Sequence, residues 1–331
     1  VYKRQALLIL AALLPLCLAA DEIRTPGGVP PIGIDNMGTE WPPLLQSRDP
    51  WLHAQLQAKI RDIGLGRAAA DRQLAVALVD ITVMERPRVA AVNAHQMMYA
   101  ASLPKIAILL GAFQKAEDGQ LDMSEENRGL LTSMIRKSSN SAATTMLERV
   151  GFDYVHRVLQ SDRYDLYDEK MNGGLWVGKP YAKKGAWKRD PMYNLSHGAT
   201  PFQVARFYYL LETGQLVSPR ASREMLQMLS EPGIEHKFVS GLNNHRPGSK
   251  IFRKSGTWRT YHSDSAIIER AGRRYIAVAM ANHPSGARWL SQLIVAMDDL
   301  IFDTTNIARD NAPATELRTM DPPRTISPTA G

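Results

Sequence analysis

The sequence predicts an α/β fold of the α+β kind: an antiparallel sheet formed from both chain ends, flanked by helices, with an inserted all-helical lobe. Two observations favour it. An apolar, β-branched run at 74–82 lies early in the chain, and similar runs at 264–270 and 274–282 lie near its end. The residues between them repeat their apolar positions at helical spacing. Because strands come first and last, one sheet takes both ends of the chain.

The early part of the chain gives one helix and two strands. The helix is predicted over 51–64, where Leu52, Leu56 and Ile60 recur at helical spacing. The strand at 74–82 follows. The sequence ERPR then turns the chain into a second strand, VAAVNA.

A series of helical segments forms the predicted lobe, about residues 104–232. Gly119 stops the first segment, whereas Thr200 can cap a later one and Pro201 fits its first turn. The segments are 104–117, two halves of 128–151 joined at a serine cluster, 200–214 and 218–231. A groove between this lobe and the sheet is a natural place for a small-molecule site.

The chain closes with an amphipathic helix predicted over 287–302, after two strands joined at Ala271-Gly272. Residues 303–331 are rich in Thr and Pro. That composition predicts a disordered tail.

The first twenty residues have the layout of a secretory signal peptide. Lys3 and Arg4 precede an apolar run that ends in small residues at Ala20. A buried N-terminal helix is the alternative. The signal predicts a periplasmic or secreted protein, with residues 21–50 as an N-terminal extension.

The single cysteine, Cys17, lies inside the signal, so we expect no disulfide and no thiolate metal site. The bulky leucine before it disfavours lipid attachment, so we expect no stable membrane anchor.

Charge and histidine spacing exclude several function classes. The net charge is +7, but the basic residues are spread along the chain and are not interleaved with stacking aromatics, which argues against nucleic-acid binding. The eight histidines show no H-x-x-x-H or related spacing, so no metal and no other cofactor is predicted. We expect a monomer that acts on a small-molecule substrate.

The stretch YAASLPKIAI places Ser102 and Lys105 three positions apart at the start of a predicted helix, so they share a face. Burial would disfavour the charged amine and lower its pKa. A neutral lysine beside the serine hydroxyl can take its proton and create a nucleophile. The alternative is a capping serine and a lysine whose charged end reaches solvent.

Two further patterns accompany this pair. Ser138-Ser139-Asn140 is an S-x-N motif at a break between helical segments, and Lys254-Ser255-Gly256 is a K-[S/T]-G motif before a predicted strand. The three motifs occur in the order found in penicillin-recognising serine enzymes. The chain resembles the class A serine β-lactamases and the wider penicillin-binding family over residues 74–301, notably in MIRKSSNSAATTML (134–147), GATPFQVARFYYLLETG (198–214) and KSGTWRTYHSDSAIIE (254–269).

The resemblance implies four catalytic positions. Ser102 would be the acylated nucleophile, and Lys105 its general base. Ser138 would relay a proton to the leaving nitrogen. Lys254 would keep positive charge near Ser138 and the substrate carboxylate.

It also implies the substrate-binding positions. Asn140 would hydrogen-bond the side-chain amide of the substrate. Ser255 and Thr257, on either side of Gly256, would bind its carboxylate. The backbone N–H groups of Ser102 and Thr257 would form the oxyanion hole, whose donors are commonly worth about 3 kcal/mol each.

The sequence departs from the class A pattern in two places. Class A enzymes activate the deacylating water with an Ω-loop glutamate, whereas the only acid here between Glu169 and Glu212 is Asp190. His197 stands where the family has an acid before its TTP sequence. Only 36 residues separate Ser102 from Ser138, so a loop and helix of the class A cleft are absent and a more open groove is expected.

The resemblance therefore implies a secreted serine hydrolase, with a catalytic domain over 51–302, that forms an acyl-enzyme on Ser102. Slow β-lactam hydrolysis is the leading activity, with Asp190 or His197 as substitute deacylation groups. A D-alanyl peptidase or esterase of the same fold is one alternative. A penicillin-binding or sensing module that is acylated without turnover is another, and a scaffold with vestigial motifs is the last.

Overall fold

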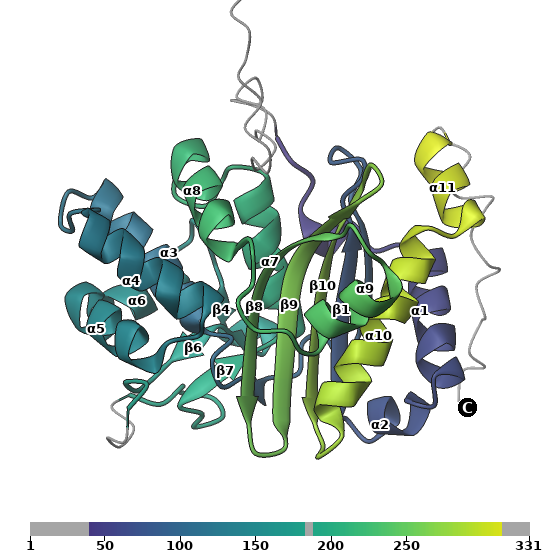
Figure 1. Cartoon of the computed structure of the whole chain (residues 1–331), viewed down its shortest axis with the longest axis horizontal. Helices are drawn as coiled ribbons and strands as arrows, with labels where there is room; N and C mark the ends of the chain where they lie inside the picture. The colour runs from purple at the N-terminus through teal and green to yellow at the C-terminus, as the bar shows by residue number, and fades with distance from the viewer. Residues whose placement is uncertain (1–39, 183–187, 313–331) are drawn as a thin grey trace, which may run out of the picture. The chain divides into compact units, whose positions relative to one another are not determined.

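The computed structural model describes residues 40–182 and 188–312 (Figure 1). These residues all belong to one compact unit within Pro31–Gly331. The predicted signal peptide, Cys17 and residues 21–39 of the predicted extension lie outside the described residues. Among the described residues, no helix combines the length and apolar content needed to cross a membrane.

Strands from both ends of the chain meet in one five-stranded antiparallel sheet of order β2-β1-β10-β9-β8. At its centre β1 pairs with β10, with Leu74 opposite Ala281 and Asp80 opposite Tyr275. This arrangement confirms the predicted fold class. The strands are β1 (Leu74–Asp80), β2 (Arg88–Val92), β8 (Lys250–Trp258), β9 (Tyr261–Arg270) and β10 (Arg273–Asn282).

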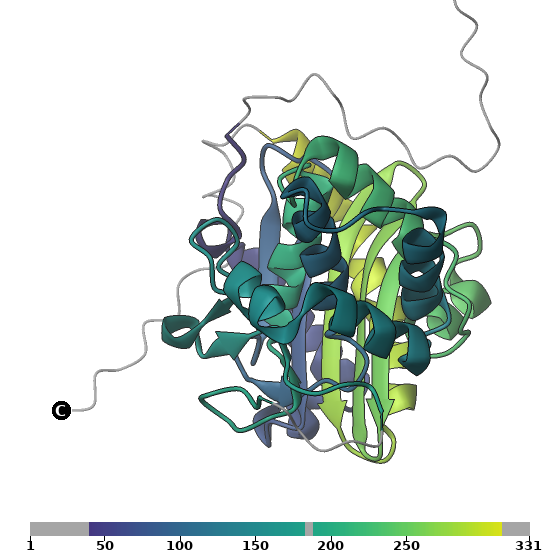
Figure 2. The same ribbon diagram turned by 90° about the vertical axis from the view of Figure 1, so that its left-hand side faces the viewer.

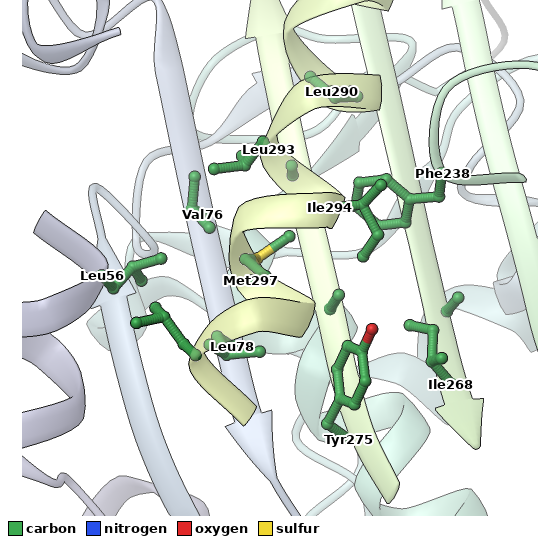
Figure 3. Close-up of a cluster of buried hydrophobic side chains, with 14 of the residues drawn as sticks. Leu56, Val76, Leu78, Phe238, Ile268, Tyr275, Leu290, Leu293, Ile294 and Met297 are labelled. Atoms are coloured by element: carbon green, nitrogen blue, oxygen red, sulfur yellow. The ribbon is translucent and has the colours of Figure 1, made fainter. Parts of the chain in front are cut away.

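The main core lies between this sheet and the helices on one of its faces (Figure 3). Leu290, Leu293, Ile294 and Met297 recur along one side of α10 and are fully buried against the strands. Full burial of each such side chain contributes about 1.5–3 kcal/mol. The helices on this face are α1 (Pro50–Asp62), α9 (Phe238–His245) and α10 (Gly286–Ile301) (Figure 1).

Helix α7 (Pro201–Glu212) packs on the opposite face of the sheet, against β1, β9 and β10. Thr200 caps it as predicted, because its hydroxyl accepts a hydrogen bond from the Gln203 backbone N–H at 3.3 Å. The helical lobe lies beside the edge strand β8 and faces the viewer in Figure 2. It contains α3 (Lys105–Glu117), α4 (Glu125–Arg136), α5 (Asn140–Val150), α6 (Phe152–Leu159) and α8 (Pro219–Leu229).

Short elements lie between the longer helices and strands. In a three-stranded sheet of order β3-β7-β6, β7 pairs with β3, so Tyr99 lies opposite Gly198. This pairing brings the segment just before Ser102 beside the segment that contains His197. The short elements are η2 (Leu44–Gln46), α2 (Gly66–Ala70), β3 (Met98–Tyr99), β4 (Tyr167–Asp168), η3 (Glu169–Met171), β5 (Gly173–Gly174), β6 (Trp176–Val177) and β7 (His197–Ala199).

The prediction of a disordered tail from residue 303 is wrong for its first part, because α11 (Thr304–Asn311) is helical. Asp303 caps this helix by accepting from the Thr305 N–H. Asp310 pairs with Arg88 at 2.6 Å and with Arg273 at 2.5 Å. Buried ion pairs therefore hold a segment whose composition alone predicts disorder. Residues 313–331 lie outside the described residues.

Candidate active site

Ser102 lies on the turn between β3 and α3. The preceding residue, Ala101, has a φ of +52°, and Ser138 has a φ of +53°. Positive φ values are uncommon for residues with side chains, and strained backbone clusters at functional sites. The Ser102 side chain is partly exposed, and among the described residues its Oγ has no hydrogen-bond partner. The hydroxyl is thus free to meet a ligand.

The edge strand β8 passes directly beside this turn. A Cβ on Gly256 would lie 2.1 Å from the Ala100 carbonyl oxygen and 2.7 Å from the Ser102 nitrogen, so only glycine fits there. The Ser263 hydroxyl also donates to the Ala100 carbonyl, at 2.9 Å. This close approach brings the backbone nitrogen of Ser102 beside Gly256, the residue before Thr257. An oxyanion hole formed by the Ser102 and Thr257 N–H groups remains a prediction.

Lys105 is one of the buried ionisable groups in the site. Its side chain is fully buried, and burial lowers its pKa to about 7. Its Nζ donates to the Ser138 carbonyl at 2.7 Å and to Asn140 Oδ1 at 2.8 Å. A neutral amine has two N–H donors, and both are then satisfied, which leaves its lone pair available to accept a proton.

The sequence predicted that Lys105 would contact the Ser102 hydroxyl. In the structure the two residues are joined only through the backbone, where the Lys105 N–H donates to the Ser102 carbonyl at 3.3 Å. The amine instead turns toward the two carbonyl acceptors of the S-x-N segment. The hydroxyl nearest to it is that of Ser138, whose Oγ lies 3.4 Å from Nζ.

Lys254 reaches the same serine from the sheet side. Its Nζ donates to Ser138 Oγ at 2.9 Å and to the Ser255 carbonyl at 2.8 Å. Burial lowers the pKa of Lys254 well below its usual value, and the neighbouring charge of Lys105 lowers it further. Ser138 therefore sits between two buried amines and can exchange protons with both.

The predicted substrate-binding residues line the same region. Asn140 is exposed at the start of α5, and because its Oδ1 accepts from Lys105, its NH₂ group is left to donate to a ligand. Ser255 and Thr257 lie two residues apart on β8, so they share a face of the strand. Thr257 is exposed, whereas Ser255 is only 5 % exposed.

Lys237, which the sequence analysis did not identify, supports Thr257 from beneath. Its Nζ donates to Thr257 Oγ1 and the Gly256 carbonyl, both at 2.7 Å, and to the Ser263 carbonyl at 3.1 Å. Burial lowers its pKa to about 8 although the charge of Asp264 opposes that shift. Because the Thr257 oxygen accepts from Lys237, its O–H is left to donate outward, for example to a carboxylate.

A buried ion pair anchors this part of β8. Arg253 pairs with the fully buried Asp264 through two bonds of 2.7 Å. Arg253 also donates to the carbonyls of Ile234 and His236. The ion pair therefore fixes the segment that precedes Lys237. Bidentate arginine–carboxylate pairs give such geometric precision.

Aromatic side chains also lie beside Lys105 in the site. The Lys105 Nζ lies 4.5 Å from the centre of the Tyr181 ring, and the Tyr181 hydroxyl donates to the Ala101 carbonyl at 3.3 Å. The His197 ring packs against Tyr181 at 4.3 Å. Tyr181, also missed by the sequence analysis, therefore covers the amine of Lys105.

The two suggested substitutes for that glutamate have other roles in the structure. Asp190 is 2 % exposed and accepts from the backbone N–H groups of Met192, Tyr193 and Leu195, so it organises its own turn. Burial lowers the pKa of His197 to about 4, which keeps the ring neutral near pH 7. Its Nε2 lies 3.2 Å from the Lys179 carbonyl.

This geometry agrees with the comparison of the chain with known families. The family described as "Beta-lactamase enzyme family" matches residues 55–128 and 126–304. The chain belongs to this family. No curated protein matches the sequence.

Solved structures show the same fold at low sequence identity. The chain is similar to PBP-A, with a TM-score of 0.59 and 18 % identity over 82 % of this chain and 100 % of that one. It is similar to a β-lactamase from Sphaerobacter thermophilus, with a TM-score of 0.58 and 15 % identity over 77 % and 97 %. A β-lactamase from Chitinophaga pinensis gives a TM-score of 0.58 and 15 % identity over 76 % and 99 %.

Proposed function

We propose that this protein is a serine hydrolase that opens β-lactam amides through an acyl-enzyme on Ser102 and releases the product slowly. The observation on which the proposal depends is the chain of contacts Lys105–Ser138–Lys254, two buried amines joined by one hydroxyl. Ser102, one turn before Lys105, has an Oγ without a hydrogen-bond partner among the described residues. Its family membership supports the same chemistry.

In the acylation step Ser102 Oγ attacks the lactam carbonyl carbon and the amide C–N bond breaks. The proton of Ser102 passes to the neutral Lys105, and the leaving nitrogen takes a proton through Ser138, which lies 3.4 Å from Lys105. Lys254 holds Ser138 in place by donating to its Oγ at 2.9 Å. Thr257, supported by Lys237, would bind the substrate carboxylate, and Asn140 its side-chain amide.

Slow release is proposed because the described residues offer no evident base for the deacylating water. Asp190 is occupied by backbone donors, and His197 is buried against Tyr181. The ring of Tyr181 lies 4.5 Å from Lys105 Nζ and shields this amine from water on that side.

Intact-protein mass spectrometry with benzylpenicillin tests the proposal. We expect the mass of the whole penicillin on the wild-type protein, no adduct on Ser102→Ala, and loss of the adduct over minutes or longer. Ser133→Ala, on α4, is the matched serine control and should be acylated like the wild type. An unmodified wild-type protein that also leaves nitrocefin intact would refute the β-lactam proposal.

The missing base favours a second candidate, a penicillin-binding or sensing module whose acyl-enzyme does not turn over. An adduct that persists for the full time course, with no nitrocefin turnover beyond one equivalent, would select it. A D-alanyl peptidase or esterase would instead release D-alanine from muropeptides or nitrophenol from short esters. We also propose export to the periplasm or cell exterior, which fractionation of the producing cell would test.

A further inference from the structure

A pocket of about 420 Å³ lies between α7 and the segment Trp41–Leu45. None of the residues of the candidate active site lines it. Its volume lies in the range of sites that bind small molecules, about 300–1,000 Å³.

Three aromatic side chains contribute to the apolar lining of this pocket, together with proline and aliphatic residues. Trp41 comes from the segment before α1, and Phe202 and Tyr209 from α7. The Tyr209 hydroxyl donates to the Pro42 carbonyl at 2.9 Å, so the two walls are fixed to each other. A flat apolar group can therefore enter without first having to order the site.

One guanidinium and two carboxylates line the same pocket. Arg206 uses its Nη1 for the Asp165 carbonyl and Gln203 Oε1, whereas its Nε and Nη2 have no hydrogen-bond partner within the described part of the chain. The Asp165 carboxylate likewise has no partner there, and Asp168 uses one oxygen, for the Lys170 N–H at 2.8 Å.

These charges lie near each other but do not pair. Asp165 and Asp168 both raise the pKa of Arg206 against the effect of burial. No ion pair within 4.0 Å joins Arg206 to either carboxylate in the described residues. A ligand with one negative and one positive group could pair with the Arg206 guanidinium and with the two carboxylates at once. A simple anion would be repelled by the carboxylates, and a simple cation by the guanidinium.

We propose that this pocket binds a zwitterionic α-amino acid with an aromatic or large apolar side chain. Arg206 takes its carboxylate, Asp165 and Asp168 take its ammonium group, and the aromatic walls take its side chain. A neutral apolar ligand would leave these charged groups desolvated and unpaired, which is unfavourable.

Calorimetric titration with phenylalanine and two blocked derivatives tests this proposal. L- and D-phenylalanine are titrated separately, and we expect one of them to bind with a Kd of about 1 mM or below. Phenylalanine amide lacks the carboxylate and N-acetylphenylalanine lacks the ammonium group, so each should bind at least tenfold more weakly. Equal binding of the blocked forms, or no binding of either enantiomer, would overturn the proposal.

Variants then locate the binding. Asp165 has a φ of +49°, which Asn tolerates, so Asp165→Asn removes the charge without disturbing the backbone. It should weaken phenylalanine binding at least tenfold, whereas Glu169→Gln, a neighbouring acid outside the pocket, and Ser102→Ala should leave it unchanged. Unchanged binding by Asp165→Asn, or its loss in Ser102→Ala, would place phenylalanine elsewhere and refute the site.

Discussion

Two buried clusters of basic side chains differ in whether carboxylates pair with them. In the cluster that holds α11, Arg88 pairs with Asp80 at 2.8 Å and Arg273 pairs with Asp310 at 2.5 Å. In the active-site cluster, Lys105 and Lys254 meet only neutral oxygens, and among the described residues neither has a carboxylate within 4.0 Å.

The difference separates a stabilising role from a chemical one. Pairing every buried cation with a carboxylate holds a helix against the sheet, and removing one partner is costly. Burial of Lys105, which has no carboxylate within 4.0 Å among the described residues to oppose it, lowers its pKa to about 7. Such an amine costs stability in its charged form, but it can accept a proton near neutral pH.

The largest expected effect comes from Lys105→Met. Because the proposed general base is lost, acylation by benzylpenicillin should slow by about 10²- to 10⁴-fold. The free energy of unfolding should stay equal or rise, since no ion pair is broken. Lys115→Met, on the same helix, is the control and should be acylated at the normal rate. Rapid acylation of Lys105→Met, or its unfolding, would remove the contrast between the clusters.

Asp80→Asn tests the paired cluster. It leaves Arg88 and Arg273 with one fewer carboxylate, so unfolding in urea should require about 3–5 kcal/mol less. The acylation rate of the folded fraction should not change. Asp71→Asn, which removes the exposed pair with Arg67, should cost about 1 kcal/mol or less. Equal losses from the two variants would mean that burial of the pair contributes nothing.

The pH dependence of acylation sharpens the comparison. With a Lys105 pKa of about 7, the reactive neutral amine is lost below that pH, so the rate should fall toward tenfold per unit below pH 6. The stability effect has the same sign. Between about pH 7 and the ordinary lysine value of 10.5, the unfolded chain binds the proton that the folded protein lacks. This lysine therefore makes the folded state more favourable as pH rises. An acylation rate that does not change between pH 5 and 8 would contradict the predicted role of neutral Lys105 as the base.

Lys237 is an intermediate case, because Asp264 opposes the effect of burial and its pKa falls only to about 8. Lys237→Met should raise the half-saturating concentration of a substrate that has a carboxylate by about tenfold, since a hydrogen bond to a charged group is worth about 1.5–3 kcal/mol. The limiting acylation rate should change little. The methyl ester of the same substrate should be insensitive to this variant. An equal effect on acid and ester would assign Lys237 a purely structural role.

The sequence could predict what neighbouring positions or ordered motifs encode. Ser102 and Lys105 share one turn, and the motif order predicted that Ser138 and Lys254 belong to the same site; Ser138 Oγ contacts both Lys105 and Lys254. The central pairing of β1 with β10 followed from strands at both chain ends.

Other features depend on contacts between distant residues that no local pattern shows. Lys237 reaches Thr257 from a position 20 residues away, and Tyr181 covers Lys105 from another loop. The α11 helix depends on Asp310, which pairs with Arg88 222 positions earlier. The prediction of a direct contact between the Lys105 amine and the Ser102 hydroxyl was wrong. The sequence does not show that the Ser138 carbonyl and Asn140 Oδ1 lie within hydrogen-bond distance of this amine.

The smallest expected effect concerns the aromatic cover of the unpaired amine. Tyr181→Ala admits water to Lys105, so the pKa of this lysine should rise and the pH limb of acylation should shift upward. The acyl-enzyme should also be lost a few times faster, because water now reaches it. Tyr181→Phe keeps the ring and loses only the hydrogen bond to Ala101, so it should behave like the wild type. If Tyr181→Phe matches Tyr181→Ala instead, the hydroxyl rather than the covering ring controls the site.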